Sequence, residues 1–201
     1  MIIELFGLPG SGKSTIIRSL VNNKIGKDIF IRNRFEKAFY LSLFLMRHPI
    51  ISFFWIKEII LQRHRELTSY KISLLFSTFA KIQKASFSNN TYIIDEGLIQ
   101  RILSIYETNL TEQKIKSILN YVVISDKILF IKGGLFDRFV FDHDKNNSPR
   151  FKMGEKYMKD WSVILTNNIM LVNTEIMKIY NTVYRSYDNS KRLPLVLDDL
   201  I

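Results

Sequence analysis

The residues best suited to chemistry lie near the start of the chain, in the run Gly7-Leu8-Pro9-Gly10-Ser11-Gly12-Lys13-Ser14-Thr15. Its glycines let the backbone turn tightly and bring amide groups against anionic oxygens without a Cβ in the way. Such amides form an anion-binding nest, and a helix that follows adds its positive N-terminal end. The pattern GxxxxGK[ST] therefore predicts a P-loop that holds the phosphates of a nucleoside triphosphate.

The side chains of this loop have separate predicted roles. Lys13 would reach the β- and γ-phosphates as a mobile point charge, and the Ser14 hydroxyl is the expected Mg²⁺ ligand. A short apolar run before the loop predicts a buried strand, and apolar residues at 16, 17, 20 and 21 predict a helix after it. The predicted nucleotide-binding residues are Leu8, Pro9, Gly10, Ser11, Gly12, Lys13, Ser14 and Thr15.

A pair of acids follows a second β-prone run, Thr91 to Ile94. This run predicts a buried parallel strand that delivers the Asp95 carboxylate to the carboxyl edge of a sheet. Asp95 would hold the Mg²⁺ shell together with Ser14, directly or through water. For Glu96 two roles stay open: it could polarise an attacking water, as in ATPases, or face an acceptor or the Mg²⁺ ion in a kinase.

Three arginines are candidates for binding the acceptor. Arg32 and Arg34 follow a short predicted strand, Asp28 to Arg32, and would lie at the edge where open parallel sheets bind ligands. Arg101 lies near the start of a predicted helix, where it could reach a phosphate or carboxylate or pair locally.

The polar loop within residues 135–152 predicts a mobile lid. Arg138 and Arg150 lie on either side of it. Closure of such a lid over the phosphates would bring these arginines in to neutralise charge in the transition state.

The rest of the chain predicts the elements that position these groups. Residues 35–87 have helical spacing throughout, more than one crossover needs, which predicts a helical insertion that covers the acceptor site or contacts a partner. We interpret its aromatic residues as core, whereas joint exposure of Phe53 and Phe54 would indicate a partner or membrane-surface patch. Those aromatic residues are Phe39, Phe44, Phe53, Phe54 and Trp55. Further predictions are a strand over 126–132, a helical stretch over 158–183 and a final strand over 195–199.

Composition narrows the class of protein. The chain has 201 residues, a formal net charge of +10 and no cysteine, which excludes disulfides and thiolate zinc sites. A length of this kind predicts one domain over residues 1–201. The start lacks the features of a signal peptide and no apolar run reaches a membrane span, so we expect a cytoplasmic protein. The positive charge favours polyanions, namely nucleotides, nucleic acid or an anionic membrane face, and does not choose among them.

The order of these elements resembles the P-loop nucleoside and nucleotide kinase group. The resemblance implies a five-stranded parallel α/β sheet with helices on both faces, a three-layer sandwich whose P-loop strand lies between the strands that end near Asp95 and Lys132. It also implies the use of MgATP, with lid arginines resembling Arg138 and Arg150. The chain departs from the group in its long helical stretch. It also lacks the aspartate-arginine signature of thymidylate kinases and the glycine-phenylalanine-proline-arginine run of adenylate kinases, so the acceptor stays open.

We therefore expect an ATP-dependent phosphotransferase that moves the γ-phosphate of MgATP to a nucleoside, a nucleotide or a sugar-type metabolite. The main alternative is a P-loop ATPase or nucleotide-dependent switch whose helical block binds a protein or membrane partner. A polynucleotide-end kinase that uses the basic surface is a third option.

Overall fold

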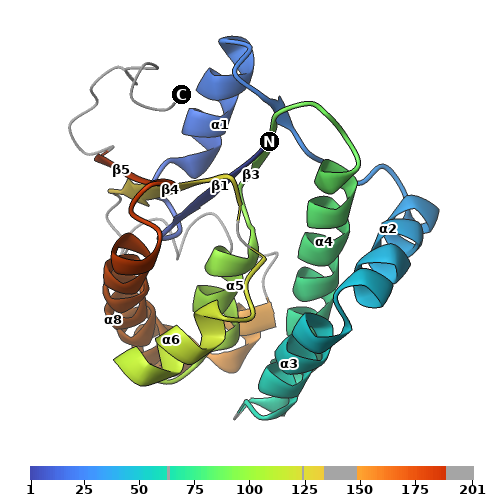
Figure 1. Cartoon of the computed structure of the whole chain (residues 1–201). Coiled ribbons are helices and arrows are strands. Elements are labelled where there is room, and N and C mark those ends of the chain that lie inside the picture. The colour runs from blue at the N-terminus through green and yellow to red at the C-terminus, as the bar shows by residue number, and fades with distance from the viewer. Residues whose placement is uncertain (63, 124, 134–148, 189–201) are drawn as a thin grey trace.

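The computed structural model describes residues 1–62, 64–123, 125–133 and 149–188 (Figure 1). Within these residues five parallel strands form one sheet in the order β2-β3-β1-β4-β5. The P-loop strand is central, between the strand that leads to Asp95 and the strand that ends at Lys132, and the predicted fold class is confirmed. The strands are β1 (Ile2–Gly7), β2 (Lys27–Asp28), β3 (Tyr92–Ile94), β4 (Lys127–Lys132) and β5 (Tyr184–Asp188).

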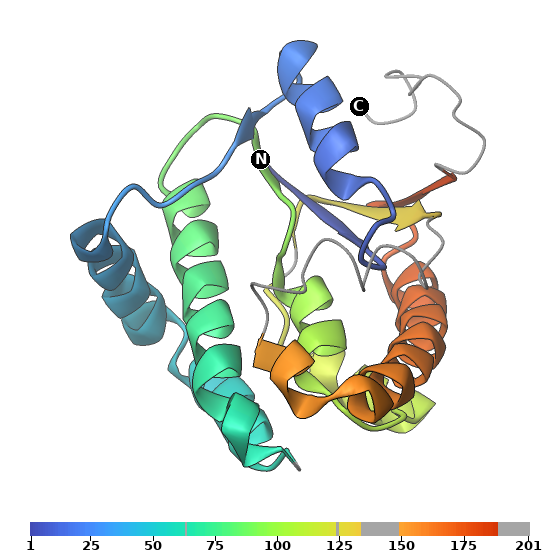
Figure 2. The same cartoon turned by 180° about the vertical axis from the view of Figure 1, so that it is seen from behind.

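Helices cover both faces of the sheet, as Figures 1 and 2 show from opposite sides. Helix α1 packs on one face, whereas α4, α5, α6 and α8 contribute to the core on the other. The helices are α1 (Lys13–Asn22), α2 (Arg34–Arg47), α3 (Pro49–Ile60), α4 (Thr68–Ser86), α5 (Leu98–Ile105), α6 (Glu112–Leu119) and α8 (Glu155–Ile179). Two short 3₁₀ helices are η1 (Arg65–Leu67) and η2 (Pro149–Met153).

The central strands have apolar residues on both faces because both faces are covered. In β1, Ile3 and Leu5 contact the α1 side, and Phe6 belongs to the larger core on the opposite side. Phe6 packs there against Phe130 of β4, with ring centroids 5.0 Å apart. The two-residue period of a strand sends successive side chains to opposite faces, so the apolar residues of one strand contribute to two cores.

The stretch predicted as a helical insertion, residues 35–87, contains α2, α3 and α4, and its outer helices α2 and α3 both pack on α4. Asn33 caps α2, since its side chain accepts a hydrogen bond of 2.8 Å from the Glu36 amide. Pro49 begins α3, and the two helices are bent by 107°. Among the described residues no helix is by itself long and apolar enough to cross a membrane. Helices α2 and α3 have the required length and apolar composition only when the bent pair is counted as one segment.

The aromatic residues of α2 and α3 divide between core and surface. Phe44 and Trp55 are fully buried; Phe44 stacks on Phe79, and the Trp55 indole donates to the Tyr121 carbonyl. Phe54 stacks on Tyr121 at 4.0 Å, so it is not exposed together with Phe53. Phe39 and Phe53, however, are 61% and 71% exposed, and their interpretation as core residues was wrong.

At the two outer strands, the boundaries in the structure differ from those predicted from the sequence. Strand β2 is only Lys27–Asp28, because the chain then leaves the sheet and buries Ile29 against the helical core. The stretch predicted as helical up to residue 183 ends at Ile179, and the chain continues as strand β5. The predicted strand at 195–199, most of the predicted lid, and Arg138 lie outside the described residues.

Candidate functional site

The P-loop follows β1 directly and turns through two glycines with positive φ, Gly10 at 76° and Gly12 at 91°. L-residues with a side chain rarely adopt such angles, so both glycines are needed for the turn. A Cβ at Gly7 would lie 2.5 Å from the Ile131 carbonyl oxygen, which leaves no room for a side chain there. Helix α1 begins at Lys13, so its N-terminal end faces the space enclosed by the loop.

Lys13 lies across its own loop. Its Nζ donates to the carbonyl oxygens of Gly7 and Leu8, both at 2.9 Å. Burial lowers the pKa of Lys13 to about 8, although Glu96 and Asp95 act in the opposite direction. Both predicted carboxylates are therefore close enough to influence the lysine of the P-loop.

The oxygen groups predicted to bind magnesium are accessible. Ser14 is exposed in the first turn of α1, and Asp95 follows β3, the strand next to β1. The Asp95 carboxylate accepts a hydrogen bond of 3.4 Å from Lys81. In the described part of the chain no three acidic or histidine side chains gather into a metal cluster. A hydroxyl, one carboxylate and substrate phosphates are a donor set that suits Mg²⁺, so these residues fit the ion.

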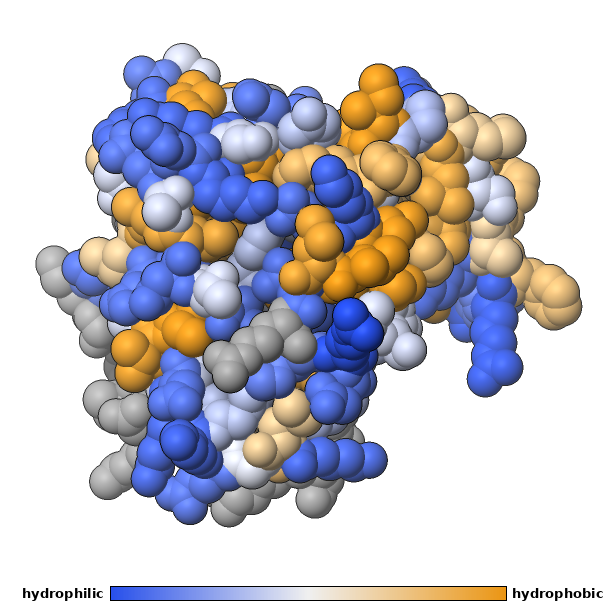
Figure 3. Space-filling view, turned by 90° about the horizontal axis from the view of Figure 1, so that it is seen from below, coloured by the Kyte–Doolittle hydropathy of each residue, from blue (hydrophilic) through white to orange (hydrophobic). Residues whose placement is uncertain are grey.

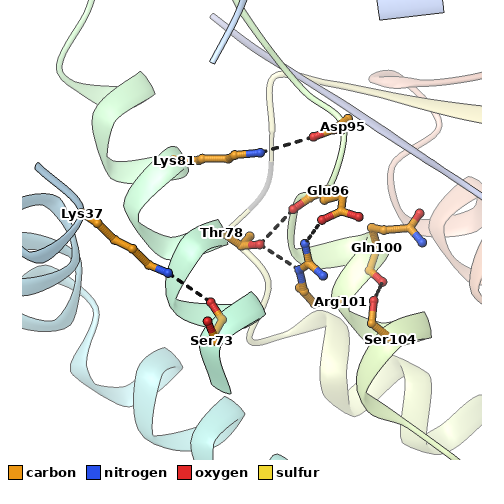
Figure 4. A network of polar contacts seen from close by, with 9 residues as sticks. All are labelled: Lys37, Ser73, Thr78, Lys81, Asp95, Glu96, Gln100, Arg101 and Ser104. Atoms are coloured by element: carbon orange, nitrogen blue, oxygen red, sulfur yellow. Dashed lines mark hydrogen bonds and ion pairs between the residues drawn. The ribbon is translucent and has the colours of Figure 1, made fainter. Parts of the chain in front are cut away.

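Glu96 and Arg101 form an ion pair beside this edge (Figure 4). The Arg101 Nε donates to the Thr78 hydroxyl at 2.8 Å, and that hydroxyl donates to the Glu96 carbonyl at 2.9 Å. Burial acts to raise the pKa of Glu96, but the positive charges of Arg101, Lys81 and Lys13 outweigh it and the pKa is lowered. Glu96 is therefore an anion at neutral pH, and Arg101 fixes its position.

A cavity of about 120 Å³ opens beside the P-loop, between α4, α5 and α8. A space of this size can hold a small ring. Arg150 is buried in its wall, with its guanidinium 5.5 Å from the Tyr70 ring and 4.7 Å from the Trp161 ring. It donates a hydrogen bond to the Ser104 carbonyl. The lining includes Pro9, Tyr70, Glu96, Arg101, Arg150 and Trp161.

Two buried polar residues that the sequence did not single out attach α5 to the P-loop strand. The Gln100 side chain accepts a hydrogen bond of 3.0 Å from the Gly7 amide. Glu4 accepts from the Ile99 amide at 2.8 Å and from the Ser125 hydroxyl at 3.1 Å. Burial raises the pKa of Glu4 to about 7. These contacts hold the helix that carries Arg101 in register with the nucleotide loop.

The structure thus brings most predicted site residues to one edge of the sheet. Arg32 and Arg34 are exposed beside the start of α2, and neither is among the residues that line the cavity. Tyr70 and Trp161 had only the helical spacing of core residues, so no local signal marked them as part of a cavity.

Comparisons with known proteins concern the family and the fold of the chain. A family model of the viral superfamily 1 RNA helicase core domain matches residues 4–109. The chain belongs to this family of P-loop NTPases. The matched range contains the P-loop and the strand that leads to Asp95, and it ends before β4.

Solved structures resemble this P-loop NTPase over its whole length. Deoxyadenosine kinase from M. mycoides with bound dATP is 14% identical, with a TM-score of 0.55 and coverage of 100% of this chain and 99% of the kinase. The same kinase with the products dCMP and a flexible dCDP is 16% identical, with a TM-score of 0.53 and coverage of 100% of this chain and 98% of the kinase. At such identities the likeness shows the fold, and it confirms the kinase-like arrangement. A comparison with curated proteins gave no match.

Proposed function

We propose that this protein, as one catalytic unit over residues 1–201, is an ATP-dependent phosphotransferase that acts on a hydroxyl-bearing small molecule. The observation that carries the proposal is the cavity beside the P-loop, whose wall includes the Glu96–Arg101 pair. A donor loop and a polar cavity at the same sheet edge are what direct transfer between two small molecules requires.

In the proposed reaction a hydroxyl oxygen of the acceptor attacks the γ-phosphorus of ATP. The bond from that phosphorus to the β–γ bridging oxygen breaks, ADP leaves, and the hydroxyl proton passes to the Glu96 carboxylate. Lys13 leaves its contacts with the loop carbonyls and binds the β- and γ-phosphate oxygens. Arg101 keeps Glu96 oriented toward the cavity.

Magnesium and the arginines supply the remaining positive charge in this proposal. Ser14 and Asp95 would hold Mg²⁺, which neutralises charge on the phosphate oxygens when bound. Arg150, in η2 just before α8, lines the cavity and would contact either the acceptor or the phosphate that is being transferred. Arg138 and the lid stay predictions from the sequence.

Nucleosides are the acceptor class that we favour. Tyr70 and Trp161 provide aromatic surface for a base, and Gln100 and Arg101 provide polar groups at the same wall. The kinase of similar fold was solved with dATP and with dCMP and dCDP. Nucleotides and sugar-type metabolites remain in the test panel.

The test is ADP release with MgATP in the presence of nucleosides, nucleotides and sugars, with identification of the phosphorylated product. We expect one class to stimulate ADP release and to appear as a phosphate ester. Lys13→Ala should keep the fold and lower turnover by about 10²- to 10³-fold, the usual loss when one transition-state charge partner is removed. Turnover like that of the wild type in this variant would refute the assignment.

A second candidate is an ATPase or nucleotide-dependent switch, which the helicase family match favours. In that case Glu96 would activate water, and phosphate would be released at one rate with and without every small acceptor. Stimulation by single-stranded oligonucleotides, steeply weakened by salt, would favour the helicase-like form of this candidate. Labelling of oligonucleotide 5′ ends would instead indicate a polynucleotide-end kinase.

A further inference from the structure

The outer surface of α2 and α3 is unusually apolar. Of the fourteen large apolar side chains exposed in the described part of the chain, seven lie between residues 34 and 61. They are Phe35, Phe39, Met46, Ile50, Phe53, Ile60 and Leu61. Figure 3 shows apolar side chains gathered over the part of the molecule to which α3 belongs. We call this set of seven residues the outer apolar face.

Helical spacing explains why the exposed apolar side chains of each helix share one side of that helix. On α2 the exposed positions 35, 39 and 46 are separated by four and seven residues, and on α3 the exposed positions 50, 53 and 60 are separated by three and seven. Such steps return to one face of a helix. Because both helices pack on α4, the exposed apolar side chains of each helix point away from α4.

The exposed charges on α2 and α3 themselves have one sign. The charged side chains exposed along α2 and α3 are Arg34, Arg47 and Lys57. The two carboxylates of these helices are neutralised: Glu36 accepts from Lys84 at 2.7 Å, and Glu58 is buried and accepts from Lys114 at 2.8 Å.

We propose that the outer apolar face docks on an anionic membrane surface. A helix that lies in a bilayer interface presents apolar and aromatic side chains flanked by Lys or Arg, which is the pattern seen on α2 and α3. The charge pattern also argues against a second copy of this chain. A two-fold interface would bring identical cationic rims together, and the net charge of +10 adds to that repulsion. This proposal does not depend on the proposed enzymatic reaction.

The experiment is flotation of the full-length protein with vesicles of phosphatidylcholine alone and of phosphatidylcholine mixed with phosphatidylserine. We expect binding to the mixed vesicles only, and weaker binding at high salt. Phe35→Ser combined with Phe53→Ser should abolish it, since both side chains would otherwise enter the interface. Val163→Ser combined with Met170→Ser, at exposed positions on α8, is the matched control and should bind like the wild type.

Substitutions that remove single positive charges test whether the membrane surface must be anionic. Arg47→Gln and Lys57→Gln should each weaken binding about fivefold, the share of one cation near an anionic surface. Lys152→Gln and Lys156→Gln, exposed elsewhere, should not. Absence of wild-type binding to mixed vesicles, equal binding to neutral vesicles, or unchanged binding in the double Phe variant would overturn the proposal. So would a dimer in light scattering that this double variant dissociates, because the face would then be occupied by a second copy.

Discussion

Gly97 lies directly on the buried carboxylate of Glu4. A Cβ at position 97 would be 2.1 Å from the Glu4 Cδ and 2.4 and 2.5 Å from its two oxygens. The φ of Gly97 is −76°, which any residue adopts, so the reason for glycine here is space and not backbone freedom. The glycine between Glu96 and α5 lets the helix N-terminus approach a carboxylate on the P-loop strand.

We expect Gly97→Ala to lower the free energy of unfolding by about 1–3 kcal/mol, because the new methyl group displaces the buried Glu4 carboxyl group from its hydrogen bonds. Urea denaturation of the wild type and the variant measures the change. Gly26→Ala is a suitable comparison, since its Cβ would meet Ile93 and Thr91 side chains at 3.0–3.2 Å and should cost less. Equal stability of Gly97→Ala and the wild type would show that Glu4 is not where the structure places it.

Glu4 should make stability depend on pH. Its pKa is raised from 4.5 to about 7 by burial, so between these values the native state holds a proton that the unfolded state has released. Stability therefore falls as pH rises through this range, by up to about 3 kcal/mol for this group. Glu4→Gln should remove that slope. The measurement is urea denaturation from pH 5 to 8, and an unchanged slope in the variant would assign the dependence to other groups.

Substitutions of Glu96 and of Arg101 should affect turnover and stability differently, although the two residues form one ion pair. Glu96→Gln should lower acceptor-dependent turnover by about 10²- to 10⁴-fold, the range for a proton-accepting group. Its thermal midpoint should fall less than that of Arg101→Gln, because a glutamine at this half-exposed position can still accept a hydrogen bond from the buried Arg101. Arg101→Gln should lower both turnover and stability, since that side chain is 3% exposed and its Thr78 contact is also lost. Glu66→Gln, at an exposed position in η1, serves as the control for loss of one acid.

Lys71 and Glu107 form a fully buried ion pair, with 3.0 Å between Nζ and Oε2. The Tyr157 hydroxyl donates to the other Glu107 oxygen at 2.6 Å. Burial lowers the pKa of Lys71, and Glu107 opposes this effect. Glu107→Gln should therefore lower the free energy of unfolding by about 3–5 kcal/mol, because Lys71 would be left buried without a countercharge.

The matched control for this pair is Lys159→Gln, which breaks an exposed ion pair with Glu155 on α8. Chemical denaturation should detect no change in that variant. If both substitutions had the same effect, burial would not be what makes the Lys71–Glu107 pair important.

The parts of the site that could be predicted are those whose chemistry is local in sequence. The P-loop needs glycines and a lysine at fixed spacing, and Asp95 ends a strand that is apolar in every residue, so both were recognisable. Glu4 and Gln100 were not, because their partners lie 95 and 93 residues away. Strand β5 was missed since its residues Tyr184 to Asp188 are mostly polar, as suits a strand that lies at the edge of the described sheet and pairs there with β4.

The helices within residues 35–87 show a second limit of prediction from sequence. Their periodicity correctly predicted helices over most of residues 35–87, but periodicity does not tell which side of a helix faces inward when nearly every position is apolar. Phe44 and Phe39 are both phenylalanines on α2. Only the packing of this helix on α4 decides that Phe44 is buried and Phe39 is exposed.

The hydrogen bond from the Gly7 amide to Gln100 has a thermodynamic consequence. It links the beginning of the nucleotide loop directly to one wall of the cavity. If an occupant of the cavity shifts α5, the loop must respond, and the dissociation constant for ATP changes. Reciprocity then requires ATP to change the dissociation constant of the occupant by the same factor. Occupation of the cavity and occupation of the loop would thus be coupled by one factor, whichever of the two is filled first.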